Sequence, residues 1–234
     1  MINAVVQCAN KQVTFCDVQL KDYIEGMLAA GTWYELNNLE FIRSLQISGN
    51  YVDAGAFIGT HSLFFALFCP ATQVYSFEAN PRSFAKLQAN IAANNVSNCT
   101  AFNVGLSDAT GVAAIYEANE TNRGATRLRP DSGDNAVASL DSFNLQDVKV
   151  MKIDVEGMEL RVLKGAVNTL KTVEHLFVEM WSEPQSKDRG MEYTAPQVVK
   201  FLAEQGIALQ RELESERLYY FRRGGQVAEL TVRC

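Results

Sequence analysis

The chain has 234 residues, 47% of them hydrophobic, and a net charge of −6. This length and hydrophobic content suffice for one substantial core, so we expect a single domain with small additions at its ends. The acidic balance argues against a broad nucleic-acid-binding face. No apolar run reaches the roughly 18 residues that span a membrane. The N-terminus also lacks a basic start followed by an apolar block, so we expect a soluble, cytoplasmic protein.

The cysteines and histidines indicate neither disulfides nor a zinc site. Five cysteines, at positions 8, 16, 69, 99 and 234, form no Cys-x-x-Cys pair, and their odd number leaves at least one unpaired. We therefore expect reduced thiols. Because only His61 and His175 are present, neighbouring residues of the sequence cannot assemble a zinc site.

Strands and helices alternate along the chain without internal repeats. Residues 1–49 carry amphipathic segments, with helices expected over 22–30 and 35–47, and predict an N-terminal helical cap of the same domain. Helices are then expected over 61–68, 81–94, 159–170 and 196–205. Seven strands are expected over 51–54, 73–77, 100–104, 148–155, 174–180, 207–212 and 218–222. Residues 112–116 predict an edge strand, followed by a polar stretch over 117–135.

Near-continuous apolar strands between helices predict an α/β protein with a mostly parallel sheet. In such a sheet the ligand crevice lies at the carboxyl ends of the strands. The acidic residues discussed below all fall at such ends.

The most informative pattern is an apolar strand that runs through Asp53 into a turn with Gly55 and Gly59, and then into a helix. A second apolar strand ends on Glu78, about twenty residues beyond this turn. The glycines let the backbone approach a ligand closely, and the helix offers unpaired N–H groups at its amino end. Glu78 would accept hydrogen bonds from a ribose diol, so the pattern predicts a nucleoside-binding site.

The spacing favours S-adenosylmethionine over a dinucleotide as the ligand. A dinucleotide site has the pattern Gly-x-Gly-x-x-Gly, whereas three residues separate Gly55 from Gly59 here and one of them is the bulky Phe57. S-adenosylmethionine carries a carboxylate and an ammonium in place of phosphates. Asp53 therefore suits its cationic end, and Glu78 suits its ribose.

Four sequence blocks resemble the FkbM family of S-adenosylmethionine-dependent methyltransferases, within the wider Rossmann-like class. They are Asp53-Ala-Gly-Ala-Phe-Ile-Gly59, Phe77-Glu-Ala-Asn-Pro81, Asn103-Val-Gly-Leu-Ser-Asp108, and Lys152-Ile-Asp-Val-Glu-Gly-Met-Glu159. The last block, which leads into Val162-Leu-Lys-Gly-Ala166, is the most specific to the family. The resemblance implies a methyltransferase domain over residues 50–234, with a mostly parallel seven-stranded sheet, flanking helices and an antiparallel strand near the C-terminus.

The resemblance also implies which residues contact the cofactor. Gly55 and Gly59 would line the methionine part, Glu78 would hold the ribose, and the turn over 106–108, with Ser107 and Asp108, would lie beside adenine. Ala56 and Ala79 would contact the cofactor as well. Asp154 would lie nearest the methyl group. The family usually has Asn where Phe57 stands and Pro where Ala79 stands, so we transfer no role to Phe57.

Three acids are the candidate catalytic residues. Asp154 and Glu156 end a central strand, where alternate side chains share a face, and Glu179 ends the next strand. Methyl transfer mainly requires alignment of the acceptor, but a hydroxyl attacks better when a base takes its proton. Other roles stay open: orientation of the cofactor ammonium for Asp154, helix capping for Glu156 and a solvated strand end for Glu179.

Asp154 and Glu156 also offer oxygen ligands to a divalent cation. Because the sequence identifies no third ligand, we predict no metal site.

Several other side chains stay open between binding and structural roles. Arg123, Arg127 and Arg129 fall in a long polar loop that either closes over an acidic acceptor or is solvated. Residues 33–35, Trp-Tyr-Glu, either shut the methyl end from water or pack in the core. Trp181 is expected to form an apolar wall of the pocket. His61 is expected on a helix surface, although it lies near enough to contact a ligand, and His175 is expected to be structural.

The sequence therefore predicts an S-adenosylmethionine-dependent O-methyltransferase that acts on a hydroxyl of a small molecule or sugar. The alternatives are methylation of a carboxylate or nitrogen, and a nucleoside-binding protein without catalysis. Residues 154–157 read Asp-Val-Glu-Gly in place of the Asn-Pro-Pro-Tyr type of motif that holds a flipped base, which disfavours nucleic acid as substrate. A homodimer is compatible with the sequence.

Overall fold

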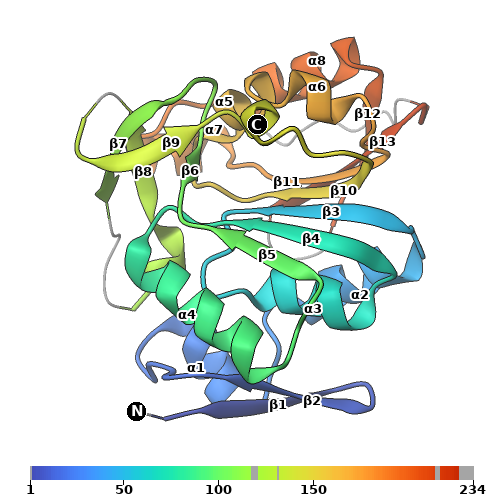
Figure 1. The fold of residues 1–234 in the computed structure, drawn as a ribbon. Helices are drawn as coiled ribbons and strands as arrows, with labels where there is room; N and C mark the ends of the chain where they lie inside the picture. Colours follow the sequence, from blue (N-terminus) through green and yellow to red (C-terminus); the bar gives the residue numbers. More distant parts are fainter. Residues whose placement is uncertain (1, 117–120, 131, 214–216, 227–234) are drawn as a thin grey trace.

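The computed structural model describes residues 2–116, 121–130, 132–213 and 217–226. Its core is a seven-stranded sheet with helices on both faces (Figure 1). The strand order is β12 (Ile207–Glu212), β13 (Leu218–Arg223), β11 (His175–Glu179), β10 (Val148–Ile153), β3 (Gly49–Ala54), β4 (Ala71–Phe77) and β5 (Cys99–Phe102). Strand β13 is antiparallel to both of its neighbours, and the pairs from β11 to β5 are parallel. The predicted fold class is confirmed.

Each face of the sheet has its own hydrophobic core. One core packs against α5 (Glu159–Lys164), α6 (Val167–Leu170) and α8 (Ala195–Glu204). The other packs against α1 (Tyr23–Ala29), α2 (Leu36–Ser44), α3 (Thr60–Phe68) and α4 (Pro81–Ala93). Successive residues Val150 and Met151 of β10 are both fully buried, one in each core. Burial on both faces is why this strand is a continuous apolar run.

The helix predicted over 159–170 is instead two short helices, α5 and α6, interrupted at Gly165 and Ala166. Gly165 approaches the chain after β6 so closely that a Cβ there would lie 2.1 Å from the carbonyl oxygen of Ser107. Glycine also has a low helix propensity, so the break combines local preference with close packing.

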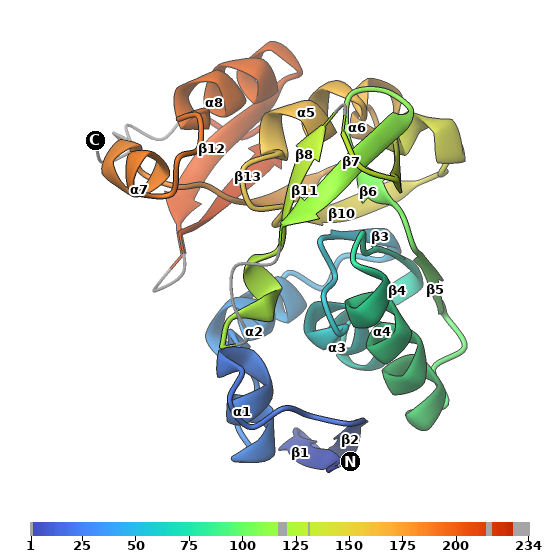
Figure 2. The same cartoon turned by 90° about the vertical axis from the view of Figure 1, so that its left-hand side faces the viewer.

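A second sheet, missed in the sequence, lies between β5 and β10. Its order is β6 (Gly105–Leu106), β9 (Asn135–Ala138), β7 (Gly111–Tyr116) and β8 (Arg127–Pro130). The edge-strand prediction for 112–116 is wrong, because β7 pairs with β9 on one side and β8 on the other. The stretch over 117–135 also contains the short 3-10 helix η1 (Arg123–Ala125) and strand β8, and a second such turn, η2 (Leu140–Phe143), follows β9. Figure 2 shows η1 reaching down to α1.

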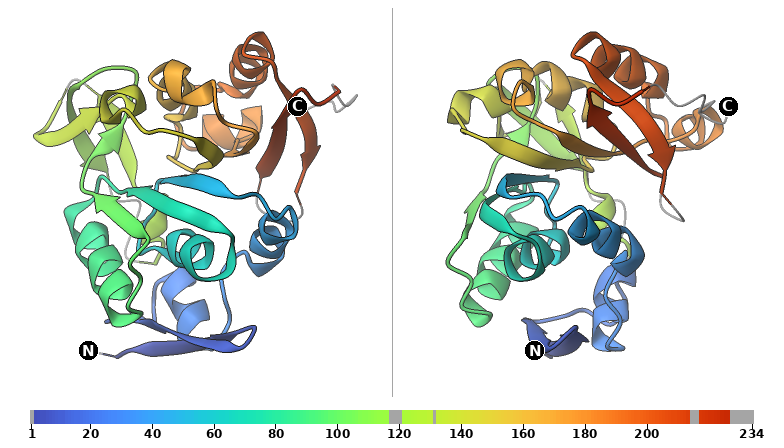
Figure 3. Two further views of the ribbon diagram at one scale, coloured as in Figure 1. Left: turned by 45° about the vertical axis from the view of Figure 1, so that its right-hand side comes forward. Right: turned by 90° about the vertical axis from the view of Figure 1, so that its right-hand side faces the viewer.

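The N-terminal segment is not purely helical, because it opens with a hairpin of β1 (Ala4–Cys8) and β2 (Lys11–Phe15). Alternating burial along β1 places Val6 in the same core as Phe64 of α3. In Figure 3 the hairpin, in dark blue, lies at the far end of the molecule from the orange and red C-terminal elements. Helices α1 and α2 match the two helices predicted for this segment. The boundary at residue 49 stays a prediction.

The described cysteines and His175 have the structural states expected from the sequence. Cys8, Cys16, Cys69 and Cys99 are free thiols, as predicted, and Cys234 lies outside the described residues. His175 is buried, and its Nδ1 lies 2.8 Å from the hydroxyl of Tyr220, which fits the predicted structural role.

Among the helices of the described chain, none combines the length and apolar character required to cross a membrane. Helix α7 (Glu183–Asp188) completes the described helices after β11.

Candidate functional site

A cleft opens at the carboxyl ends of β3, β4, β10 and β11. The core contributes the glycine turn after β3, Glu78 after β4, and acids at the ends of β10 and β11. The opposite wall comes from the N-terminal segment and the insertion between β5 and β10, including Tyr23, Tyr34 and Arg123. The cleft therefore lies where a parallel sheet is expected to bind its ligand.

Strand register brings the predicted acids to one place. Ile153 of β10 pairs with Ala54 of β3 and with Val178 of β11. The residues that follow, Gly55, Asp154 and Glu179, consequently stand side by side at one edge of the sheet. All three line the cleft.

The two glycines of the turn are required for different reasons. Gly55 has a φ of +85°, and a Cβ there would lie 1.7 Å from the carbonyl oxygen of Asp154. Gly59 has a φ of +92°, and its Cβ would lie 2.5 Å from Cδ1 of Leu87 on α4. Gly55 and Ala56 line the cleft, where the methionine part of the cofactor is predicted. Gly59 instead lets α3 pack against α4 and is not among the lining residues.

Asp53, predicted to bind the cofactor, lies beneath the cleft and does not line it. Its side chain is buried, its Oδ2 accepts a 2.5 Å hydrogen bond from Ser62, and its Oδ1 has no partner among the described residues. The hydroxyl of Ser76 donates to that of Ser62 at 2.8 Å. Asp53 also pairs in register with Lys152 of β10. In this structure it joins strands β3 and β4 to α3 and places negative charge under the cleft.

Glu78 occupies the position predicted for ribose recognition. It is 7% exposed and lines the cleft. Its Oε2 accepts the N–H of Phe57 at 2.7 Å, and its Oε1 accepts the N–H of Asn80 at 2.7 Å. Burial raises the pKa of Glu78 to about 7, against the lowering effect of these two hydrogen bonds. Because each carboxylate oxygen has a further lone pair, Glu78 can still accept from a ribose diol.

The part of the cleft predicted to hold adenine has apolar walls. Phe77, Val104, Leu106 and Leu128 line it, together with Ala79, whose contact with the cofactor stays a prediction. Ser107 and Asp108 do not line it. The hydroxyl of Ser107 donates to Asp108 at 3.0 Å, and Asp108 forms an ion pair with Arg161 at 3.2 Å. These two residues therefore support the turn behind Leu106, and their contact with adenine stays a prediction.

Three carboxylates meet at the other end of the cleft. Ligand oxygens of Asp154, Glu156 and Glu179 all lie within 4.8 Å of one another. Each acid has a basic partner: Asp154 pairs with Lys152 at 3.0 Å, Glu156 with Arg189 at 3.8 Å, and Glu179 with Arg217 at 2.6 Å. The candidate catalytic residues are thus brought together, inside a ring of three cations.

The pKa values separate these acids into different roles. Burial opposes ionisation of Asp154, but the charge and hydrogen bond of Lys152, together with a hydrogen bond from Glu179, hold the pKa of Asp154 below its usual value. Burial, with the neighbouring charge of Asp154, raises the pKa of Glu156 to about 7. Burial and the same charge raise the pKa of Glu179 well above its usual value. Asp154 is therefore a fixed anion, and Glu156 can exchange a proton near neutral pH.

The structure supplies the third oxygen ligand that the sequence did not identify. Asp154, Glu156 and Glu179 have the spacing of a divalent-cation site. Three basic side chains already balance their charge, however, so the cluster needs no cation to be neutral. We assign no metal to it.

Three cations of the cleft were missed in the sequence. Arg189 follows α7 and Arg217 precedes β13, so no sequence spacing relates them to the acids of the cleft. Lys152 stands two residues before Asp154 on β10, and this strand spacing was the one available signal. Burial alone would lower the pKa of Lys152, but the charges of Asp154 and Asp53 raise it above its usual value.

His61 was expected on a helix surface, and this prediction is wrong. It is 3% exposed, lines the cleft, and its Nε2 lies 2.8 Å from Oε2 of Glu35. Glu35 precedes α2, so the contact joins the N-terminal segment to the first turn of α3. In the same segment, Trp33 packs edge-on against Phe15 and Phe64, which places it in the core. Tyr34 lines the cleft instead.

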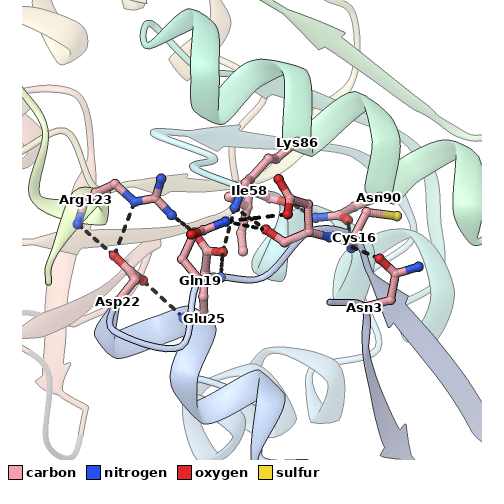
Figure 4. A network of polar contacts seen from close by, with 10 residues as sticks. Asn3, Cys16, Gln19, Asp22, Glu25, Ile58, Lys86, Asn90 and Arg123 are labelled. Carbon is pink, nitrogen blue, oxygen red and sulfur yellow. Dashed lines mark hydrogen bonds and ion pairs between the residues drawn. The ribbon is translucent and has the colours of Figure 1, made fainter. Parts of the chain in front are cut away.

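The three arginines predicted in one loop have separate structural partners. Arg123, in η1, binds the carboxylates of Asp22 and Glu25 at the start of α1 (Figure 4). Arg127 of β8 donates to the carbonyl oxygen of Arg189 at 2.6 Å. Arg129 stacks on Tyr116, with its Cζ 4.8 Å from the ring centre. Each of the three arginines thus has a partner within the protein, and their presence in this segment does not require an acidic acceptor.

Comparisons with known proteins agree with this fold and site. The methyltransferase FkbM domain matches residues 53–208. The hexuronic acid methyltransferase AglP of Haloferax volcanii is 32% identical over 145 residues, which are 58% of this chain and 57% of that protein. Methyltransferase sdnD of Sordaria araneosa is 26% identical over 200 residues, which are 69% of this chain and 74% of that protein. The chain therefore spans only part of these relatives.

A crystal structure of methyltransferase FkbM from Methylobacillus flagellatus has a TM-score of 0.56 at 16% identity, over 85% of this chain and 52% of that one. This likeness, the strand order and the cleft define a Rossmann-like methyltransferase fold. With most of its length matched by the domain, the chain belongs to the FkbM methyltransferase family.

Proposed function

We propose that this chain transfers the methyl group of S-adenosylmethionine to a hydroxyl oxygen of a small molecule, sugars included. The observation that carries the proposal is the meeting of Asp154, Glu156 and Glu179 within 4.8 Å, in the same cleft as Gly55 and Glu78. The cofactor end and the acid cluster are thus continuous. The name of the Haloferax volcanii relative supports an acceptor of sugar type.

The residues present fit the cofactor. Glu78 keeps free lone pairs for a ribose diol, Gly55 provides the left-handed turn at the cleft wall, and Asp154 is an ionised acid for the cationic end. When bound, S-adenosylmethionine supplies an electrophilic methyl group on a sulfonium. Lys152 donates to Oδ2 of Asp154 and keeps this acid ionised. The role of Asp154 is therefore to attract the positively charged end of the cofactor and not to take a proton.

Glu156 is the base in this proposal. Its pKa of about 7 suits proton transfer at neutral pH. As the hydroxyl oxygen bonds to the methyl carbon, the sulfur keeps the electron pair of the broken bond and Glu156 takes the hydroxyl proton. Glu179 is bound to Arg217 and serves to position the cluster.

The test is methyl transfer from S-adenosylmethionine that carries a trideuterated methyl group, with panels of sugars, phenols and carboxylic acids. We expect the label in an ether that resists mild alkali, with one S-adenosylhomocysteine formed for each methyl transferred. Label in an alkali-labile ester would identify a carboxylate as the methylated group instead. Cofactor binding without transfer to any acceptor would support the nucleoside-binding alternative.

A further inference from the structure

Arg189 has a fixed backbone at the end of α7. Its N–H donates to the carbonyl oxygens of Gln185 and Ser186, both at 3.2 Å. Its own carbonyl oxygen accepts a 2.6 Å hydrogen bond from Arg127 of β8. Helix α7 and strand β8, which are distant in sequence, therefore fix the position of the Arg189 backbone.

Arg189 and Arg217 enclose the indole ring of Trp181. The Cζ of Arg189 is 3.6 Å from the ring and the Cζ of Arg217 is 3.5 Å from it. Two guanidinium groups this close to one ring must occupy its opposite faces. Stacking of this kind orients a guanidinium plane and leaves the N–H groups at its rim available.

The two arginines differ in whether their donors are used. Arg217 donates to Oε1 of Glu179 from Nη2 at 2.6 Å and from Nε at 3.2 Å. The guanidinium of Arg189 makes no hydrogen bond to any residue that the structure describes. Its Nη1 lies 3.8 Å from Glu156, which is too long for a hydrogen bond.

Arg189 is therefore an oriented cation with free donors in the cleft. Its side chain is 30% exposed, and it lines the cleft with the acid cluster. Each of the other cations of the described cleft donates at least one side-chain hydrogen bond to an acid, since Lys152 binds Asp154, Arg217 binds Glu179 and Arg123 binds Glu25. Burial of Glu156, which raises its pKa to about 7, leaves Arg189 still less well neutralised near neutral pH.

Resting on the methyl transfer proposed above, we propose that Arg189 binds a carboxylate of the methyl acceptor, so that the substrate is a sugar acid or a similar hydroxy acid. A planar guanidinium with free N–H groups binds a carboxylate by donating two parallel hydrogen bonds to its oxygens. Glu156, 3.8 Å from Arg189, then stands beside a neighbouring hydroxyl of the same small molecule. The carboxylate is a recognition group, because its oxygens are engaged by Arg189, and the neighbouring hydroxyl is methylated.

The test is calorimetric titration of matched acidic and neutral sugars into the full chain saturated with S-adenosylhomocysteine. The probes are p-nitrophenyl β-D-glucuronide and p-nitrophenyl β-D-glucoside, which differ in the carboxylate, and the corresponding galactose pair. The variants are Arg189→Met, Arg189→Lys and the control Arg211→Met. Arg211 also stacks on an aromatic ring, Phe41, at 4.2 Å, but lies outside the cleft lining.

For the wild type and Arg211→Met we expect at least one acid to bind about tenfold more tightly than its neutral partner. Arg189→Met should abolish this difference, and Arg189→Lys should retain part of it, while the affinity for S-adenosylhomocysteine stays constant. Equal binding of acid and neutral sugars by the wild type, or a difference that survives in Arg189→Met, would overturn the proposal. If S-adenosylhomocysteine itself does not bind, the methyl-transfer proposal fails. The same titrations without it then still decide the role of Arg189.

Discussion

Three side chains of the cleft stand on strained backbone. Phe57 has a φ of +49°, Glu156 a φ of +51° and Arg217 a φ of +57°, in the left-handed region that costs residues with a Cβ about 1–2 kcal/mol. All three line the cleft. Backbone strain of this kind persists where the surrounding structure imposes it, and strained residues are frequent at functional sites. For Glu156 it adds an independent reason, besides its pKa, to assign the base here.

The pH dependence of turnover tests Glu156 at the scale of one residue. A base must be ionised, and burial raises the pKa of Glu156 to about 7, so turnover should rise with pH through about 7. Glu156→Gln should lower kcat by at least about a hundredfold and remove this rise, while binding of S-adenosylhomocysteine is retained. The measurement is kcat from pH 5.5 to pH 9 with an acceptor found in the labelled-methyl screen. A substitution that leaves kcat and its pH profile unchanged would show that Glu156 is not the base.

Individual site residues were predictable where a strand end fixes them. Gly55, Glu78, Asp154 and Glu179 follow directly from apolar strands in the sequence, and parallel register then brings them to one edge. Arg189 could not be predicted in the same way, because α7 and the contact from β8 place it. The burial of His61 likewise depends on Glu35, twenty-six positions earlier in the chain.

At the scale of elements, α1 is clamped to the core by a buried carboxylate. Glu25 is fully buried and binds Arg123 from η1 and Lys86 from α4, the latter at 2.6 Å (Figure 4). It also accepts the N–H of Gln19 at 2.6 Å. The cleft wall formed by Tyr23 and Arg123 depends on this clamp.

Glu25→Gln should therefore lower the free energy of unfolding by about 3 kcal/mol, because two cations lose their buried partner. The matched control is Glu40→Gln, whose ion pair with Arg43 at 2.7 Å is on the surface. Its loss should cost no more than about 0.5 kcal/mol. Urea unfolding measures both values, and equal stability of the two variants would show that the clamp contributes nothing.

The strands and helices that could be predicted from the sequence are those with a long hydrophobic pattern. The central strands and α3, α4 and α8 follow from hydrophobic pattern, because each buries a broad apolar face. The hairpin β1–β2 and the strands β8 and β9 were missed, since each has only four or five residues and pairs through the backbone. The break between α5 and α6 depends on the nearby carbonyl oxygen of Ser107, which local sequence does not show.

At the scale of the whole molecule, the seven-stranded sheet separates two hydrophobic cores. The cleft opens at the edge of the sheet where its parallel strands end. The N-terminal segment and the insertion between β5 and β10 together cover this edge, and the N–H of Arg123 joins them by donating to Asp22 at 2.8 Å. The fold class follows from alternation of strands and helices in the sequence. How the cleft is covered does not, because it depends on contacts between segments about a hundred residues apart.

The central claim is that this cleft binds S-adenosylmethionine with Glu78 on the ribose. Calorimetric titration of S-adenosylhomocysteine into the wild type, Glu78→Gln and Glu159→Gln tests it most directly. Glu159 is also a buried acid with a pKa raised by burial to about 7, but it lies outside the cleft lining, so it controls for loss of a buried carboxyl. We predict one binding site in the wild type, at least about tenfold weaker binding in Glu78→Gln, and wild-type affinity in Glu159→Gln. No binding by the wild type, or unchanged binding by Glu78→Gln, would contradict the account.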